Sequence, residues 1–167
     1  MTHGRPPRRR GPVAVNIVAL ATARATRLPP AERDQVMAPL RDAVAPLRAG
    51  VASELGWWHA VSAVNVGDAI ETQGVVRGLA GHLRSIDLAL QEIGKRARST
   101  GAWAPPALYY EERDLLDLLV DLHGHQIRSL SFGEFSSALD KAIAQTRSAP
   151  DGRVVDVDVD EPQGALT

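Results

Sequence analysis

The sequence of 167 residues contains no cysteine. Without thiols the chain can form no disulfide framework, no cysteine-ligated zinc or iron–sulfur site, and no cysteine nucleophile. It also lacks an apolar run of the roughly 20 residues that a membrane-spanning helix needs, so an integral membrane protein is not expected. Aromatic residues make up only 4% of the chain. We therefore expect a core of helices that pack closely through small side chains.

The net charge of -1 conceals three segments of different charge. Residues 1–27 carry six arginines and no acid, residues 28–149 have a net charge of -3, and residues 150–167 have a net charge of -4. The first segment is interpreted as a basic Arg/Pro arm followed by an apolar stretch, and the second as a single helical domain. The third is predicted to be a disordered acidic tail, although alternation within residues 154–160 leaves a strand open.

The first segment has the order of a secretory signal peptide. Arginines precede an apolar run from Val13 to Ala21, which ends in small residues. Asn16 inside the run, and Arg24 and Arg27 directly after it, argue against this interpretation. We therefore expect a cytoplasmic protein, with secretion through residues 1–23 as the alternative. Residues 16–26 are expected to form either a short helix with Asn16 as N-cap or an extended strip.

Helical periodicity through the middle segment predicts an all-α fold, a bundle-like single domain of four to five helices. Residues 31–49 show a helical pattern that contains Pro39 and Pro46. Because proline removes a helical hydrogen bond, we expect this helix to be kinked or divided. Ser53 is expected to cap a helix that ends near Gly74.

Two longer patterns define the expected centre of the bundle. Residues 75–98 are predicted to form a helix with a heptad seam at positions three and four residues apart. The seam residues are Val76, Leu79, Leu83, Ile86, Leu90, Ile93 and Ala97. A second helix, residues 108–130, carries two apolar stripes and is expected to pack antiparallel to the first. Ser131 and Glu134 form a capping box that should open the last helix.

No constellation indicates catalysis or a bound metal. His123 and His125 are two residues apart, and on a helix such positions project about 200° apart, so they cannot chelate one ion together. One imidazole is expected to be packed and the other solvated. No serine lies in a nucleophile-elbow sequence. We therefore expect a protein that is not an enzyme and that has no cofactor.

The candidate binding residues fall into three groups. Arg5, Arg8, Arg9 and Arg10 are candidates for nucleic-acid contact, because an arginine-rich arm neutralises phosphates. Trp57, Trp58 and His59 are candidates for contact with a protein partner, although core packing of at least one tryptophan is the alternative. Asp114, Asp117 and Asp121 form an acidic ridge that is either solvated or a docking face for a basic partner. The heptad seam also leaves a homodimer open.

Several short segments together resemble small uncharacterised helical proteins of proteobacterial phages, prophages and plasmids. The segments are Arg8–Arg10 with Pro12-Val13, residues 47–52, Trp58, Asn65-Val66, residues 101–103, Leu122-His123 and Gln126. The likeness covers most of residues 8–145. It implies a cytoplasmic accessory or regulatory role in a mobile element, with nucleic acid or a host protein as partner, and it transfers no catalytic residue. A self-associating structural or adaptor protein is the alternative.

Overall fold

The computed structural model describes residues 17–148, and within them the chain is helical. The six helices of this part are α1 (Ile17–Ala25), α2 (Pro30–Arg48), α3 (Glu54–Gln73), α4 (Ala80–Ala97), α5 (Tyr110–Ser129) and α6 (Phe132–Ser148). Apart from a single bridge between Arg27 and Ser131, the described residues form no β-structure. The predicted all-α class is confirmed. The arginine arm and the acidic tail, with its alternative strand, lie outside the described residues.

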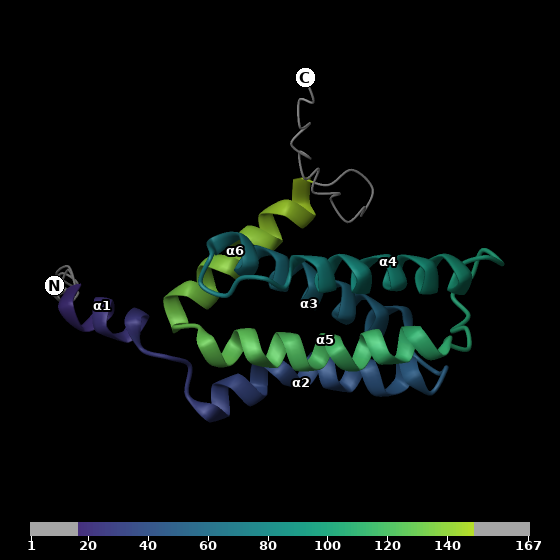
Figure 1. Cartoon of the computed structure of the whole chain (residues 1–167), viewed down its shortest axis with the longest axis horizontal. Coiled ribbons are helices and arrows are strands. Elements are labelled where there is room, and N and C mark those ends of the chain that lie inside the picture. The colour runs from purple at the N-terminus through teal and green to yellow at the C-terminus, as the bar shows by residue number, and fades with distance from the viewer. Residues whose placement is uncertain (1–16, 149–167) are drawn as a thin grey trace, which may run out of the picture.

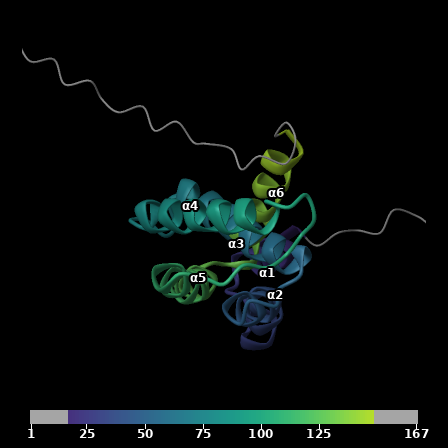
Figure 2. The ribbon, with the colours of Figure 1, turned by 90° about the vertical axis from the view of Figure 1, so that its right-hand side faces the viewer.

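Helices α2 to α5 form an up-and-down bundle (Figure 1). Each contacts the next along the chain, and α5 also contacts α2, which closes the ring of four helices. The view turned by 90° looks along these helices and shows α6 crossing at one side (Figure 2). Helix α6 packs against α3, and α1 projects from one end of the bundle and contacts α6. The antiparallel pairing predicted for the two central helices is confirmed as the α4–α5 pair.

Of the two alternatives for the first long helix, its division is wrong, because α2 continues through both Pro39 and Pro46. The kink stays a prediction. One face of this helix is buried against α3 and α5 through Met37, Leu40 and Leu47. Pro39 lies on the exposed side, where water can satisfy the carbonyl that loses its amide partner. Burial of the apolar face therefore holds a helix that its internal prolines alone would interrupt.

The heptad seam is confirmed, but its helix begins later than predicted. From Leu83 to Ala97 every seam residue is at most 3% exposed. Residues 75–79 form a turn instead of helix, and Gly78 adopts a φ of 90°. The backbone amides of Gly78 and Leu79 donate to Oε1 of Glu71, at 2.6 and 3.1 Å. A carboxylate from the end of α3 thus satisfies amides at the start of α4, which fixes where α4 begins.

The predicted helix caps are confirmed. The Ser53 hydroxyl accepts a hydrogen bond from the Gly56 amide at 3.2 Å, and Gly74 ends α3 with a φ of 78°. At the start of α6, Ser131 donates its backbone amide to Oε2 of Glu134 at 2.7 Å. This bond and one from the Ser131 hydroxyl hold the pKa of Glu134 below its usual range. Asn16, the proposed cap of α1, lies outside the described residues.

Three tryptophans gather at the end of the bundle opposite α1. The Trp57 indole is buried and donates to the carbonyl of Leu90 at 2.8 Å, and Trp103 donates to the carbonyl of Ala52. The Arg98 guanidinium lies 4.4 Å from the centre of the Trp57 ring. Gly94 on α4 faces this ring so closely that an added Cβ would lie 2.6 Å from Cζ2 of Trp57. The indole therefore packs directly on the backbone of α4.

This packing predicts opposite effects for alanine at two glycines of α4. Gly94→Ala should lower the free energy of unfolding by about 1–3 kcal/mol, because the new methyl group must displace a buried, hydrogen-bonded indole. Gly81→Ala is the matched control, because no atom outside its own helix lies within 4 Å of its added Cβ. The control should raise stability by at most about 0.5 kcal/mol, because Gly81 lies in the first turn of α4, where glycine costs less than in the middle of a helix. Urea unfolding followed by circular dichroism measures both, and similar effects at the two sites would contradict the packing.

Candidate functional site

An open cleft of about 240 Å³ lies between the first half of α2 and the last two turns of α5. Its lining residues are Pro30, Arg33, Asp34, Met37, Arg41, Gly124, Ile127 and Arg128. Three arginines and one aspartate supply its charge, so the cleft has a formal charge of +2. The start of α2 and the end of α5, which line the cleft, lie at the end of the bundle from which α1 projects (Figure 1).

Helical spacing places the α2 side chains of the cleft on one face. Arg33, Met37 and Arg41 are four residues apart, which puts them one above another on α2. Met37 is 3% exposed and Ile127 of α5 is 1% exposed, so both belong to the apolar floor. Arg33 is partly buried, whereas Arg41 is exposed.

Helix α5 contributes a small residue and a folded-back arginine. A Cβ added to Gly124 would lie 3.4 Å from Nη1 of Arg128 and 3.7 Å from Cε of Met37. The Arg128 guanidinium therefore lies over the preceding turn of α5, beside the methionine of the floor. A larger side chain at position 124 would fill the space that these groups leave open.

The positive charge of the cleft is only weakly compensated by the described residues. Arg41 lies 3.5 Å from Asp34, but both side chains are more than half exposed, and such pairs contribute about 0–1 kcal/mol. The Nε of Arg33 is buried and donates to no acceptor in residues 17–148. No salt bridge within the same range involves Arg128. Guanidinium groups with free donors favour binding of an anion.

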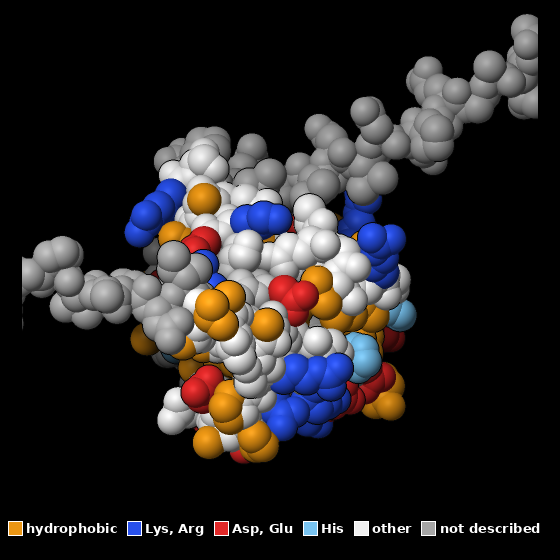
Figure 3. All heavy atoms as spheres, turned by 90° about the vertical axis from the view of Figure 1, so that its left-hand side faces the viewer, with side chains coloured by type: hydrophobic (Ala, Val, Ile, Leu, Met, Phe, Trp, Pro, Cys, Tyr) orange, Lys and Arg blue, Asp and Glu red, His pale blue; other side chains and the backbone are white. Residues whose placement is uncertain are grey.

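The segment that follows the arginine arm is tied to the same end of the bundle. Phe132 donates its amide to the carbonyl of Thr26 at 2.9 Å, and Arg27 is bridged to Ser131, three residues after Arg128. Figure 3, which views this end of the molecule, shows Lys and Arg side chains gathered in a patch on its lower part, with a histidine beside them. We call this end of the bundle the basic end. The arginines of its elements are Arg24 of α1, beside Gly133, Arg27 of the linker, and Arg33, Arg41 and Arg128 of the cleft.

The three aromatic and histidine candidates do not form one exposed surface. Trp57 is buried, Trp58 is half-buried with its ring 4.7 Å from that of Trp57, and His59 is exposed. Arg98 lies over the rings of both tryptophans and forms an ion pair with Glu54 at 2.8 Å. The tryptophan pair is thus in contact with a cation of its own chain. Its predicted role in partner binding stays a prediction.

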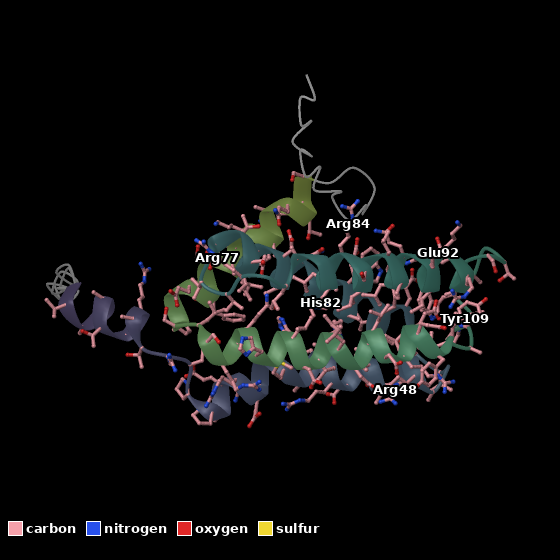
Figure 4. The ribbon with its side chains drawn as sticks, in the orientation of Figure 1. Arg48, Arg77, His82, Arg84, Glu92 and Tyr109 are labelled. Atoms are coloured by element: carbon pink, nitrogen blue, oxygen red, sulfur yellow. The ribbon has the colours of Figure 1, made fainter. Side chains whose placement is uncertain are left out.

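The acidic ridge is present on α5. Asp114 and Asp121 are exposed, whereas Asp117 is partly buried and pairs with Nη1 of Arg48 at 2.8 Å. Figure 4 places Arg48 near the end of the bundle that carries Tyr109, opposite α1. One carboxylate of the predicted docking face is therefore already paired within the chain.

The two histidines of α5 lie as predicted, one packed and one solvated. His123 is 5% exposed, and its Nδ1 has no hydrogen-bond partner in the described part of the chain, whereas His125 is exposed. No group of three or more His, Cys, Asp or Glu residues in residues 17–148 is arranged to hold a metal ion. The neighbouring Gln126 donates to the carbonyl of Gly67 at 2.9 Å, which links α5 to α3.

The α2–α5 cleft was not among the residues selected from the sequence. The spacing of Arg33, Met37 and Arg41 is visible in the sequence as two cations and an apolar residue on one helix face. Arg128 belongs to another helix, however, and only the closing of the bundle places it beside them. Without that partner, the two arginines of α2 are indistinguishable from an ordinary solvated face.

Comparisons of the chain with protein-family models, curated proteins and solved structures gave no match. Each helix within residues 17–148 is too short or too polar to cross a membrane. The site is therefore interpreted from its own geometry and charge.

The burial of His123 predicts a pH-dependent stability. Desolvation lowers its pKa from 6.5 to about 4, so between these values the unfolded chain binds a proton that the folded chain does not. Stability should therefore fall as the pH drops from about 6.5 to about 4, by about 3 kcal/mol from this residue alone. Urea unfolding at several pH values measures this loss.

Comparison of two histidine variants separates this effect from that of other titrating groups. Between about pH 6.5 and pH 4, His123→Gln should lose about 3 kcal/mol less stability than the wild type loses. His125→Gln should retain the wild-type pH dependence, because His125 is exposed. Identical profiles for wild type and His123→Gln would show that the buried imidazole does not govern the acid sensitivity.

Proposed function

We propose that the protein is a non-enzymatic accessory protein that binds the phosphate backbone of nucleic acid. Its contact surface is the basic end together with the arm that carries Arg5, Arg8, Arg9 and Arg10. The observation that carries this proposal is the cleft that Arg33, Arg41 and Arg128 line, with Arg27 and Arg24 nearby at the end of the bundle from which α1 projects.

The arginines of the basic end raise the number of phosphates that the protein can neutralise above the number that the arm alone can reach. On duplex DNA the logarithm of the binding constant falls with the logarithm of salt by about 0.9 per phosphate neutralised. Four arm arginines would give a slope of only about -4, whereas all nine would give up to about -8. Arginines held on a folded surface also lose less conformational entropy on binding than those of a peptide arm. The bundle then fixes where the nucleic acid lies.

The resemblance to small helical proteins of phages and plasmids supports a regulatory role in a mobile element, in the cytoplasm. Contact with a host protein through the other candidate residues has less support. Arg98 already covers the tryptophan pair, and Arg48 already pairs with Asp117. Arg33 and Arg128 of the basic end, by contrast, form no ion pair within residues 17–148.

Charge-neutralising variants test the proposal directly. Binding of a labelled duplex is measured across a salt series of about 50–200 mM for the full-length protein, for a variant lacking residues 1–12, and for Arg33→Gln/Arg41→Gln/Arg128→Gln. The triple variant should weaken binding and reduce the magnitude of the salt slope by about 3. Loss of the arm should reduce it by about 4.

The control for this experiment removes three exposed cations elsewhere, in the variant Arg84→Gln/Arg113→Gln/Lys141→Gln. Arg84 extends outward from α4 on the side away from α5 (Figure 4). The control should retain nearly all of the affinity and salt slope. Equal weakening by both triple variants would indicate non-specific attraction by total charge, and absence of binding in every protein would refute the proposed function.

Self-association is a second candidate function, favoured by apolar side chains on the α1–α6 surface. Val18, Phe132, Leu139 and Ile143 are between 38% and 75% exposed. The heptad seam, by contrast, is buried in the chain's own core, so a second copy would need another surface. Light scattering across the micromolar range should then show a dimer that Leu139→Lys/Ile143→Lys dissociates. A constant monomer mass would dispose of this candidate.

A further inference from the structure

The charge of the α2–α5 cleft is matched to one kind of phosphate group. With three arginines and Asp34, the cleft has a formal charge of +2. A phosphate monoester carries about -1.5 to -2 at neutral pH, whereas each diester of a nucleic-acid backbone carries a single negative charge. A monoester therefore neutralises the cleft more completely than a backbone phosphate does.

The donors of the cleft come from two helices, with Arg33 and Arg41 on α2 and Arg128 on α5. Arg33 presents a buried Nε that has no acceptor within residues 17–148. Arg128 lies over Gly124, beside the floor. Arg41 stands at the opposite part of the α2 face, held only by its exposed pair with Asp34. A monoester has three terminal oxygens, one for each guanidinium, whereas a diester within a chain has two.

The floor and the size of the cleft suit the carbon part of a small ester. Pro30, Met37 and Ile127 supply an apolar base beneath the arginine rim. The volume of about 240 Å³ equals that of about eight molecules of liquid water, at about 30 Å³ each. A space of this size takes one phosphate with part of its attached sugar.

We propose that this cleft binds a phosphate monoester, the group found at a 5′-phosphorylated end of nucleic acid and on a nucleoside 5′-monophosphate. Arg33, Arg41 and Arg128 hold the phosphate, and the apolar floor receives the adjoining sugar. The proposal rests on the proposed function only for the source of the ester. With nucleic acid as that source, the arm follows the backbone while the cleft holds the terminal phosphate.

The test compares two oligonucleotides that differ only in a 5′-phosphate or a 5′-hydroxyl. Fluorescence anisotropy with the full-length protein should give about tenfold tighter binding of the phosphorylated strand. Arg33→Gln/Arg128→Gln should abolish this preference, and Arg84→Gln/Arg113→Gln should retain it. Circular dichroism of each variant verifies that the helices are intact.

A second variant blocks the cleft without changing its charge. Gly124→Leu places a side chain between Arg128 and Met37, where the added Cβ already lies within 4 Å of both. It should remove the preference for the 5′-phosphate while retaining the salt-dependent binding that the arm provides. Persistence of the full preference in this variant would overturn the proposed site.

Competition by a nucleoside 5′-monophosphate, with the unphosphorylated nucleoside as control, separates this proposal from the proposed function. The protein could bind the monophosphate but neither oligonucleotide, and the cleft variants could abolish that binding. This result would support the cleft as a site for free nucleotides and refute nucleic-acid binding. Equal binding of both oligonucleotides would overturn the cleft proposal and leave nucleic-acid binding intact. Failure to bind any of these probes would overturn both.

Discussion

The close approach of α3 to its neighbours is the constraint on which the rest of the structure depends. Helix α3 contacts α2, α4, α5 and α6, so it needs small residues on several faces at once. A Cβ at Gly67 would lie 3.1 Å from both Gln126 of α5 and Leu83 of α4. Ala60 is fully buried on the same helix. Because small residues keep α3 narrow, four other helices can pack against it.

The cleft exists because the ring of helices α2 to α5 closes. Helices α2 and α5 are the first and last of the four-helix ring, and they become neighbours only because α3 and α4 bring the chain back. Gln126, hydrogen-bonded to the carbonyl of Gly67, fixes the position of α5 along α3. Gly124 and Arg128 lie on the adjoining turns, so this bond also fixes their position. The tryptophan cluster and Arg98 hold the opposite end of the bundle, whereas Arg33 and Arg128 of the basic end form no ion pair within residues 17–148.

Sequence patterns predicted the structural features that depend on residues close together in the sequence. They missed the features that depend on residues far apart in the sequence. The seam from Leu83 to Ala97 and the cap at Ser53 are local, so spacing and residue type were enough. The start of α4 depends on Glu71 from another helix, and the heptad pattern therefore extended it too far back. The prolines of α2 were overridden by burial against two other helices. The arginine cleft combines α2 and α5, and no local pattern could show that these two helices meet.

The central claim is that nucleic acid contacts the basic end of the bundle and not its other faces. Hydrogen–deuterium exchange of the full-length protein, with and without a 5′-phosphorylated oligonucleotide, tests this most directly. Within residues 17–148, the account predicts slower exchange confined to α1, the segment that joins α1 to α2, the start of α2 and the end of α5. Protection centred on the tryptophan end, or unchanged exchange throughout residues 17–148 under conditions of saturated binding, would contradict it.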